Sequence, residues 1–297
     1  MARVDAHAHV VLPRYGKALG QLLPPVPAPL DGLKRMLDQY GIARAIVSTG
    51  PPGAPSRDIA RIANEELAEI ARAEPGTFAV LAALPLGDDV DVATEAVEHA
   101  YDELGMDGVL LLSNVNGRYL GDPALEPLFA ELDRRSAYAF LHPGYPPHAL
   151  PLDHPVWLYE FTFETTRALA NLIYSGTLHR YPHIRLQAAH LGGTTPFVAH
   201  RLASLAGRQP DDAVAAPDGA LEYLHRLYYD TGLAANAAAL ASTLEVTTVD
   251  HVVFGTDWPY ADLPDGDDPA PDLSSLGADR RLVDGLNIEG LFPRWSV

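Results

Sequence analysis

Histidine and aspartate residues stand where several short hydrophobic runs end, and both residue types can bind a metal ion. The first run closes on His7 and His9, with one residue between them. Because side chains alternate along a strand, this spacing places both imidazoles on one face, within reach of one cation. Later runs, in the segments AFLHPG, LQAAHLGG and VVFGTDWP, close on His142, His190 and Asp257. These residues are the candidates for a metal-dependent site.

The elements that must position these residues follow a regular alternation of strand and helix. Short β-branched runs between amphipathic segments are typical of parallel βαβ units. We expect strands over Arg3–His9, Ala43–Ser48, Phe78–Leu84, Gly108–Leu112, Tyr138–His142, Ile184–His190, Leu227–Thr231 and His251–Gly255. We expect helices over Leu30–Tyr40, Arg57–Ala73, Val90–Leu104, Pro123–Arg135, Phe163–Tyr174, Asn236–Leu244 and Asp279–Gly285, and one that opens near Thr195–Pro196.

Eight such units in 297 residues predict a (β/α)8 TIM barrel with loop insertions at its C-terminal face, formed by one domain over residues 1–297. The candidate residues then lie at the carboxyl ends of strands one, five, six and eight, where barrel enzymes carry their catalytic groups. A doubly wound open sheet is the alternative, but no GxGxxG or P-loop motif follows the first strand. The acidic stretches Gly207–Gly219 and Asp262–Pro271 are predicted to form mobile loops.

Composition narrows the class of protein. The chain has 39 acidic and 21 basic residues, a formal net charge of −18, so we expect neither nucleic acid nor an anionic membrane as a partner. It contains no cysteine, so any metal must bind to histidine, aspartate or glutamate. No apolar stretch approaches the roughly 18–20 residues of a membrane span, and the N-terminus MARVDAHAHV lacks a signal-peptide pattern. These features favour a cytoplasmic enzyme that acts on a small molecule.

Other residues near the predicted mouth have weaker claims. Asp230 ends the seventh strand and is expected to fix a loop or to support a ligand from behind. His148 and His154 follow the fifth strand in a Pro-rich loop that can overhang the mouth. In the same region, four aromatic residues are candidates for an apolar wall around a ring: Trp157, Tyr159, Phe161 and Phe163.

The ordered motifs resemble the amidohydrolase-2 branch of the amidohydrolase superfamily, which contains aminocarboxymuconate semialdehyde decarboxylase. The segments that carry the resemblance are VDAHAHVVLP, FLHPGYPP, FETTRALANLIYSGTLHRYP, HLGGTTP and VVFGTDWPY, and they span the chain from Val4 to about Tyr260. YLGDPALEPLFAELDRR, together with the FETTRAL block, is most similar to 6-methylsalicylate decarboxylase-like sequences.

The resemblance implies roles for individual residues. His7 and His9 match the metal pair of strand one, His142 the ligand of strand five, and Asp257 the carboxylate of strand eight. His190 matches a histidine that serves as a catalytic acid or base close to the metal. One divalent metal is implied, zinc first and manganese second, in a homo-oligomer that is a dimer or a tetramer.

Two departures from the family pattern bear on the substrate. Dihydroxybenzoate decarboxylases of this branch often begin with Glu-x-His and carry a glutamate three residues after the strand-six histidine, where this chain has Gly193. That places the chain nearer the aminocarboxymuconate and methylsalicylate types. An arginine that holds a substrate carboxylate in some relatives has no certain counterpart, and Arg14, Arg118 and Arg167 are the candidates. With Trp157 and Phe161, Arg14 and Arg167 complete the predicted substrate-binding set.

Three functions remain open. The first is non-oxidative decarboxylation of a small aromatic or unsaturated carboxylic acid, in which His190 or Asp257 protonates the carbon that loses carbon dioxide. The second is hydrolysis of a lactone, amide or imide, in which Asp257 takes a proton from a metal-activated water. The same ligands permit both reactions, and the resemblance favours decarboxylation. The third is a binding protein that keeps the barrel without catalysis.

Overall fold

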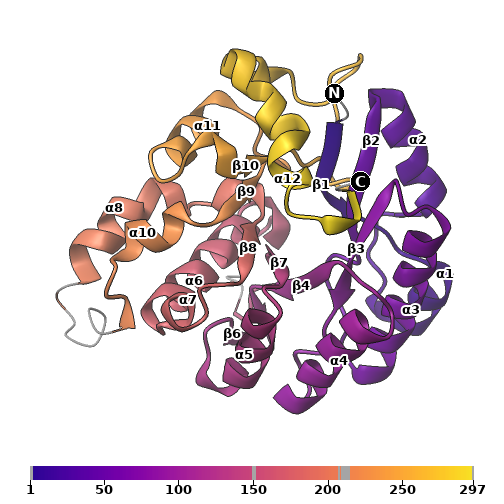
Figure 1. Ribbon diagram of the computed structural model, residues 1–297, viewed down its shortest axis with the longest axis horizontal. Coiled ribbons are helices and arrows are strands. Elements are labelled where there is room, and N and C mark those ends of the chain that lie inside the picture. The colour runs from indigo at the N-terminus through magenta and orange to yellow at the C-terminus, as the bar shows by residue number, and fades with distance from the viewer. Residues whose placement is uncertain (1–2, 149–151, 207, 209–214, 296–297) are drawn as a thin grey trace.

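Eight parallel strands follow one another around a barrel in the order in which they occur along the chain (Figure 1). The structure is a computed structural model that describes residues 3–148, 152–206, 208 and 215–295. The strands are β1 (Arg3–His9), β2 (Ile42–Ser48), β3 (Phe78–Ala83), β4 (Gly108–Leu112), β7 (Tyr138–His142), β8 (Arg185–Ala188), β9 (Tyr228–Asp230) and β10 (Val252–Val253). Backbone hydrogen bonds from Ala6 N–H to Phe254 O, at 2.8 Å, and from Asp257 N–H to His7 O, also at 2.8 Å, join the last strand to the first. The predicted (β/α)8 barrel is confirmed.

Helices surround the strands (Figure 1). They are α1 (Pro13–Leu19), α2 (Leu30–Tyr40), α3 (Arg57–Ala73), α4 (Val90–Asp102), α5 (Glu126–Arg134), α6 (Glu160–Tyr174), α7 (Thr177–Arg180), α8 (Thr195–Ala206), α10 (Ala220–His225), α11 (Ala237–Leu244) and α12 (Asn287–Glu289). Local signals set several ends: Ser56 Oγ accepts from Ile59 N–H at the start of α3, and Gly41, at φ +59°, ends α2. Every residue of β3, β4 and β7 is buried, as expected for parallel strands covered on both faces.

Two hydrophobic layers result. One lies between the sheet and the surrounding helices, and the other fills the barrel itself. The interior layer includes Phe140 near the middle of β7 and, from the C-terminal segment, Ile288, Phe292 and Trp295. Phe292 packs on Tyr138, the first residue of β7, with ring centroids 4.6 Å apart. The C-terminal segment therefore closes the amino-terminal end of the barrel and leaves the carboxyl end for the site.

The structure differs from the predicted elements in several places. The region between His9 and Pro29, for which no helix or strand was predicted, contains α1, which begins with Pro13 and buries Tyr15 and Leu19. The short antiparallel pair β5 (Asn114–Val115) and β6 (Arg118–Tyr119) was not predicted, although Asn116 and Gly117 both have positive φ, as a tight hairpin turn requires.

The predicted last helix, Asp279–Gly285, corresponds to a helical stretch that begins at residue 280, contains a π-helical turn over Leu282–Leu286 and follows 3₁₀ structure over Pro271–Asp279. Helix α6 starts three residues earlier than predicted, and strands β8, β9 and β10 are shorter than predicted. The stretch Asp262–Ala270 has neither helix nor strand. Most of Gly207–Gly219, also predicted as a loop, lies outside the described residues.

Candidate metal centre

His7 and His9 reach the mouth of the barrel because β1 changes register within its own length. Val4 and Ala6 pack inside the barrel, yet His7 and His9, at the odd positions, also point into it. A register irregularity between Asp5 and Ala8 allows this switch. The buried carboxylate of Asp5 supports it by accepting hydrogen bonds from His7 N–H at 3.0 Å and Thr256 N–H at 2.9 Å. The bulge, rather than simple alternation, therefore sets the direction of both imidazoles.

Glycines leave room for these two rings. A Cβ at Gly232 would lie 2.7 Å from His7 Nδ1, and one at Gly255 would lie 2.7 Å from His7 Cβ. At Gly50 a Cβ would lie 2.9 Å from His9 Nδ1, and φ is +63°. Real Cβ atoms do not approach so closely, and a side chain at Gly50 would also be strained. The backbone is thus shaped to fit closely around both histidines.

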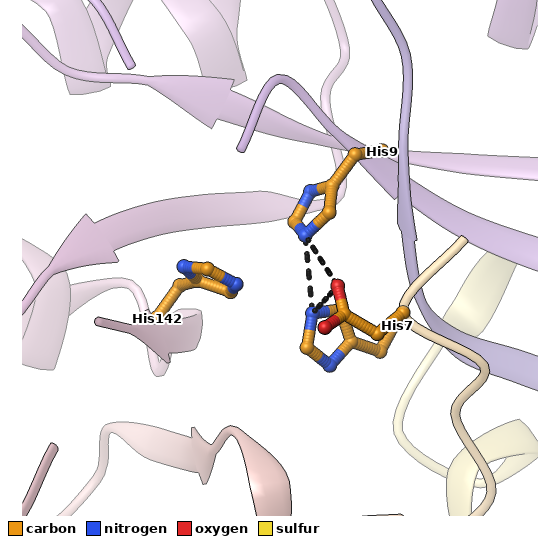
Figure 2. A group of neighbouring side chains, drawn as sticks. His7, His9 and His142 are labelled. Atoms are coloured by element: carbon orange, nitrogen blue, oxygen red, sulfur yellow. Dashed lines mark hydrogen bonds and ion pairs between the residues drawn. The ribbon is translucent and has the colours of Figure 1, made fainter. Parts of the chain in front are cut away.

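Four ligand-type side chains converge at the mouth: His7, His9, His142 and Asp257. One ligand atom of each lies within 4.8 Å of the others, and all four residues are buried. Asp257 Oδ1 is 3.1 Å from His7 Nε2 and 3.3 Å from His9 Nε2. Figure 2 shows His9 beside His7, with His142 facing the pair from another strand. Within the described residues, the structure thus brings together the four predicted ligands.

The hydrogen bonds behind the rings fix which nitrogen is free to bind a cation. His7 Nδ1 lies 2.9 Å from Asp230 Oδ1, and His142 Nδ1 lies 2.9 Å from the carbonyl oxygen of Pro143. Both partners can only accept, so both Nδ1 atoms carry a proton. His9 Nδ1 lies 2.9 Å from Ser48 Oγ. The Nε2 atoms of His7 and His142 therefore turn their lone pairs toward the shared point, as metal-binding imidazoles do.

Two observations show that these residues fit a divalent metal. His142 Nε2 is buried and has no hydrogen-bond partner among the described residues. His7 Nε2 and His9 Nε2 are only 3.1 Å apart, a contact that two lone pairs tolerate only with a proton or a cation between them. Nitrogen and carboxylate donors in this number are those of catalytic zinc and related sites.

Electrostatics agree with a site for a cation. Burial lowers the pKa of His142 far below its usual value and also lowers that of His9, so both imidazoles stay neutral. Burial opposes protonation of His7 as well, but the carboxylates of Asp230 and Asp257 outweigh it and raise the pKa of His7 to about 10. Without metal, a proton therefore occupies the position that a metal ion would take.

Asp230 supports the site from behind. Its Oδ1 accepts from His7 Nδ1, from His190 N–H at 3.2 Å and from Gly232 N–H at 3.0 Å, and its Oδ2 accepts from Gln187 Nε2 at 2.7 Å. Burial raises the pKa of this carboxyl, but His7, His190 and the hydrogen bond from Gln187 together lower it more, so Asp230 remains ionised. The expected supporting position for Asp230 agrees with this geometry.

His190 sits beside the four converging residues. It lies two residues after the end of β8, and its Nε2 is 3.1 Å from Asp257 Oδ2. His190 and Asp257 both have positive φ, +57° and +59°, a conformation that costs energy in residues with a side chain and is concentrated at functional sites. His190 Nδ1 is buried and has no hydrogen-bond partner among the described residues. A proton can pass between the imidazole and the carboxylate.

The four predicted substrate-binding residues lie in different surroundings. Phe161 is in the first turn of α6, with its ring centroid 6.4 Å from that of His142 and 5.6 Å from that of Tyr145. Trp157 lies in a short 3₁₀ turn with 58% of its surface exposed. Arg14 pairs with Glu66 and Glu69 at the surface, and Arg167 pairs with Glu160 and Glu164. Of the four, Phe161 is the one that contacts a member of the metal centre.

Two tyrosines that were not among the candidates also border the site. The ring of Tyr260 lies 5.8 Å from that of His9, and burial raises the pKa of Tyr260 to about 12, with a further contribution from Asp257. Tyr145 packs on Phe161 and is half exposed. Both follow a ligand by three residues, in HPGY and DWPY, and that spacing could have indicated them.

Comparison with known proteins places this geometry in a family. The sequence matches the amidohydrolase family over residues 4–286. The chain belongs to the amidohydrolase family. It is 30% identical over 280 residues to a 6-methylsalicylic acid decarboxylase from Penicillium expansum, an alignment that covers 88% of this chain and 86% of the relative. The predicted branch is confirmed.

Solved structures support the fold. The crystal structure of an amidohydrolase II has a TM-score of 0.86 at 24% identity, over 98% of this chain and 99% of that one. A dihydroxybenzoic acid decarboxylase from Polaromonas sp., crystallised with manganese and 2-nitroresorcinol, has a TM-score of 0.82 at 22% identity, over 98% and 96%. At these identities the likeness establishes the barrel alone.

Proposed function

We propose that this chain is a metal-dependent, non-oxidative decarboxylase of a small aromatic or unsaturated carboxylic acid, with 6-methylsalicylate as the reference substrate. The observation that carries the proposal is the convergence of His7, His9, His142 and Asp257, with His190 on the free oxygen of Asp257, in a member of the amidohydrolase family. The similarity to a fungal 6-methylsalicylic acid decarboxylase supports the substrate class.

His7, His9, His142 and Asp257 would hold one divalent ion, zinc first and manganese second. Bound there, the ion would supply Lewis-acid chemistry to the carboxylate or a neighbouring hydroxyl of the substrate. Three histidines and one carboxylate favour zinc, and manganese is supported by its presence in the decarboxylase from Polaromonas sp.. The net charge of −18 disfavours an anionic substrate, and a bound divalent ion would supply positive charge at the site.

The side chains of the site would transfer one proton to the substrate. Loss of carbon dioxide breaks the bond between the ring and its carboxylate, and the electron pair left on that carbon takes up a proton. His190 delivers this proton, and Asp257 Oδ2, 3.1 Å from His190 Nε2, stabilises the protonated imidazole beforehand. Phe161, Tyr145 and Tyr260 would border the ring and help to exclude water.

The test is carbon dioxide release from a panel of ortho-hydroxybenzoates that includes 6-methylsalicylate, measured on metal-loaded protein. We expect release that stops after chelation, returns when metal is restored, and falls about 10²–10⁴-fold in His190→Ala. His183→Ala is a matched control, because His183 is exposed and pairs with Asp133 on the outside of the barrel.

A panel of lactones, amides and imides separates decarboxylation from hydrolysis at the same site. Turnover of that panel, with no carbon dioxide from any acid, would replace the proposal with a metal-dependent hydrolase. Binding of acids that stabilises the protein without any product would instead indicate a binding protein.

Two further proposals concern the protein in the cell. We propose a homo-oligomer, a dimer or a tetramer, supported by the large apolar side chains that α6, α8 and the turn before α6 expose: Trp157, Leu158, Phe163 and Phe197. We also propose a cytoplasmic location, supported by the absence of cysteine. Among the described helices, none is both long and apolar enough to cross a membrane.

A further inference from the structure

A column of polar side chains runs through the apolar interior of the barrel and ends beneath the metal centre. Its members are Tyr138 on β7, Gln187 on β8 and Asp230 on β9, and all three are buried. Tyr138 packs against Phe292 at the closed end, whereas Asp230 contacts His7 at the mouth. Burying a polar group in apolar surroundings destabilises the fold unless the group is hydrogen-bonded, so these three side chains must satisfy one another.

Gln187 joins the two ends of this column. Its Nε2 donates to Asp230 Oδ2 at 2.7 Å and to the carbonyl oxygen of Ala6 at 3.2 Å. Its Oε1 accepts from the hydroxyl of Tyr138. Both partners of Nε2 can only accept, so the direction of the amide is determined. Gln187 therefore ties β7, β8, β9 and β1 together through one side chain.

The bond to Gln187 decides how Asp230 is held. Three donors share Asp230 Oδ1, and one of them is His7 Nδ1, whereas among the described residues only Gln187 donates to Asp230 Oδ2. Without Gln187, the carboxylate could rotate about its last bond and would keep a buried oxygen with no donor. The imidazole of His7, which takes its direction from Asp230, would then lose its fixed orientation.

We propose that Gln187 is a positioning residue for the metal centre: it fixes Asp230, which in turn orients His7, and Tyr138 anchors Gln187 from below. The proposal rests on the metal site of the proposed function. Partners behind a ligating histidine fix its tautomer and direction, and their loss typically weakens metal binding about 10–100-fold. Asp230 is the direct partner of His7, and Gln187 is one hydrogen bond further from the metal site.

The test measures metal affinity directly, by chelator competition for zinc and by the visible spectrum of the cobalt-substituted protein. Gln187→Met keeps the length of the side chain but removes both polar atoms. We expect its zinc Kd to rise about 10-fold or more, with a changed cobalt spectrum. Tyr138→Phe removes only the far anchor, so a smaller rise, of about 2–5-fold, is expected.

A double variant tests whether the two residues act in series. If Tyr138 acts through Gln187, the combination of Gln187→Met with Tyr138→Phe should bind zinc no more weakly than Gln187→Met alone. Independent effects that multiply in the double variant would overturn the role of Tyr138 as an anchor of Gln187.

Asn64→Leu controls for general destabilisation. Asn64 is a buried residue on α3. Its Nδ2 donates to the carbonyl oxygen of Ala83 at 3.0 Å, and its Oδ1 accepts from Ala83 N–H at 2.8 Å. The Asn64→Leu variant should have a lower Tm, whereas its zinc Kd and cobalt spectrum should stay as in the wild type. Wild-type affinity and spectrum in Gln187→Met would overturn the positioning role. Absence of zinc or cobalt binding by the wild type would overturn the metal centre itself, a result distinct from the first.

Discussion

The two ends of the barrel are built from the same strands but fulfil opposite requirements. At the closed end, Ile288, Phe292 and Trp295 pack against the starts of the strands, and the barrel interior is apolar. At the open end, His7, His9, His142 and Asp257 lie close together and are buried just as completely. The first arrangement satisfies its side chains by packing. The second leaves His142 Nε2 and His190 Nδ1 buried without a hydrogen-bond partner among the described residues.

The open end therefore lowers the free energy of unfolding, and the closed end raises it. Buried polar atoms without partners cost about 1–3 kcal/mol each, and positive φ at His190 and Asp257 adds strain. The packed end must offset these costs. Changes at the open end should therefore remove function with little loss of stability, and changes at the closed end should do the reverse.

The largest effect is expected for Asp257→Asn at the open end. The substitution removes a ligand charge and the partner of His190 Nε2, so decarboxylation should fall by at least about 10³-fold. Tm of the metal-free variant should remain within a few degrees of the wild type, because the amide keeps the volume of the carboxylate. Carbon dioxide release and calorimetry on the same sample measure both. A large drop in the metal-free Tm would contradict the division between the two ends.

The next effect is expected for Phe292→Ala at the closed end. Phe292 is 1% exposed and packs on Tyr138 and Trp295, so its truncation should cost about 3–5 kcal/mol of unfolding free energy. The folded variant should keep its zinc Kd at low temperature. Phe197→Ala is the matched control, since Phe197 is 85% exposed and its loss should change stability by less than about 0.5 kcal/mol in the monomer. In folded Phe292→Ala, zinc binding weakened beyond the about 2–5-fold expected for Tyr138→Phe would show that the two ends are coupled by more than the contact through Tyr138.

The closed and open ends also differ in how far the sequence predicts them. The eight strands and the ligands His7, His9, His142 and Asp257 were predicted, because hydrophobic runs and ligand types are local patterns. The hairpin at Asn116–Gly117 carried a local signal that could have been used.

Other features depend on which strands become neighbours. The β1 bulge that turns both His7 and His9 inward depends on Asp5 meeting Thr256, 251 positions away in the chain. Gln187 beneath Asp230 and the surface pairing of Arg14 with Glu69 are likewise contacts between distant segments. The family resemblance suggested Arg14 and Arg167 as carboxylate-binding groups, but each has acidic neighbours that only the fold reveals.

A moderate effect on stability is expected when a metal ion binds at the open end. Zinc at 100 times its Kd should stabilise the folded state by about 2.7 kcal/mol, since it binds the folded protein and displaces the proton at His7. A chelator should reverse the rise in Tm, and Phe292→Ala should show the same rise from a lower starting point. Asp257→Asn is the control that should show little or none. Repeating the measurement with manganese in place of zinc compares how strongly the two metals stabilise the folded protein. An equal rise in Asp257→Asn would place the metal elsewhere on the chain.

The smallest effect is expected from acid at the closed end, where Asp268 accepts from both terminal nitrogens of Arg280, at 2.6 and 2.7 Å. The guanidinium of Arg280 lowers the pKa of Asp268 below its usual 3.8 in the folded protein. Below pH 3.8 the unfolded chain therefore binds the proton first, and the stability from this pair is lost as pH falls through the folded pKa. Because the pair is partly exposed, its contribution should be less than about 1 kcal/mol.

Asp268→Asn, followed by urea unfolding from pH 7 to pH 3, isolates that contribution. The variant should be slightly less stable than the wild type at pH 7, and the difference should shrink as the pH drops below about 4. Asp267→Asn, at the exposed neighbouring position, should track the wild type throughout. Zinc affinity at pH 7 should be unchanged in both variants, because the pair holds β1 at Arg3, the end of that strand opposite His9. A difference that persists unchanged to pH 3 would mean that packing, rather than charge, makes Asp268 matter at the closed end.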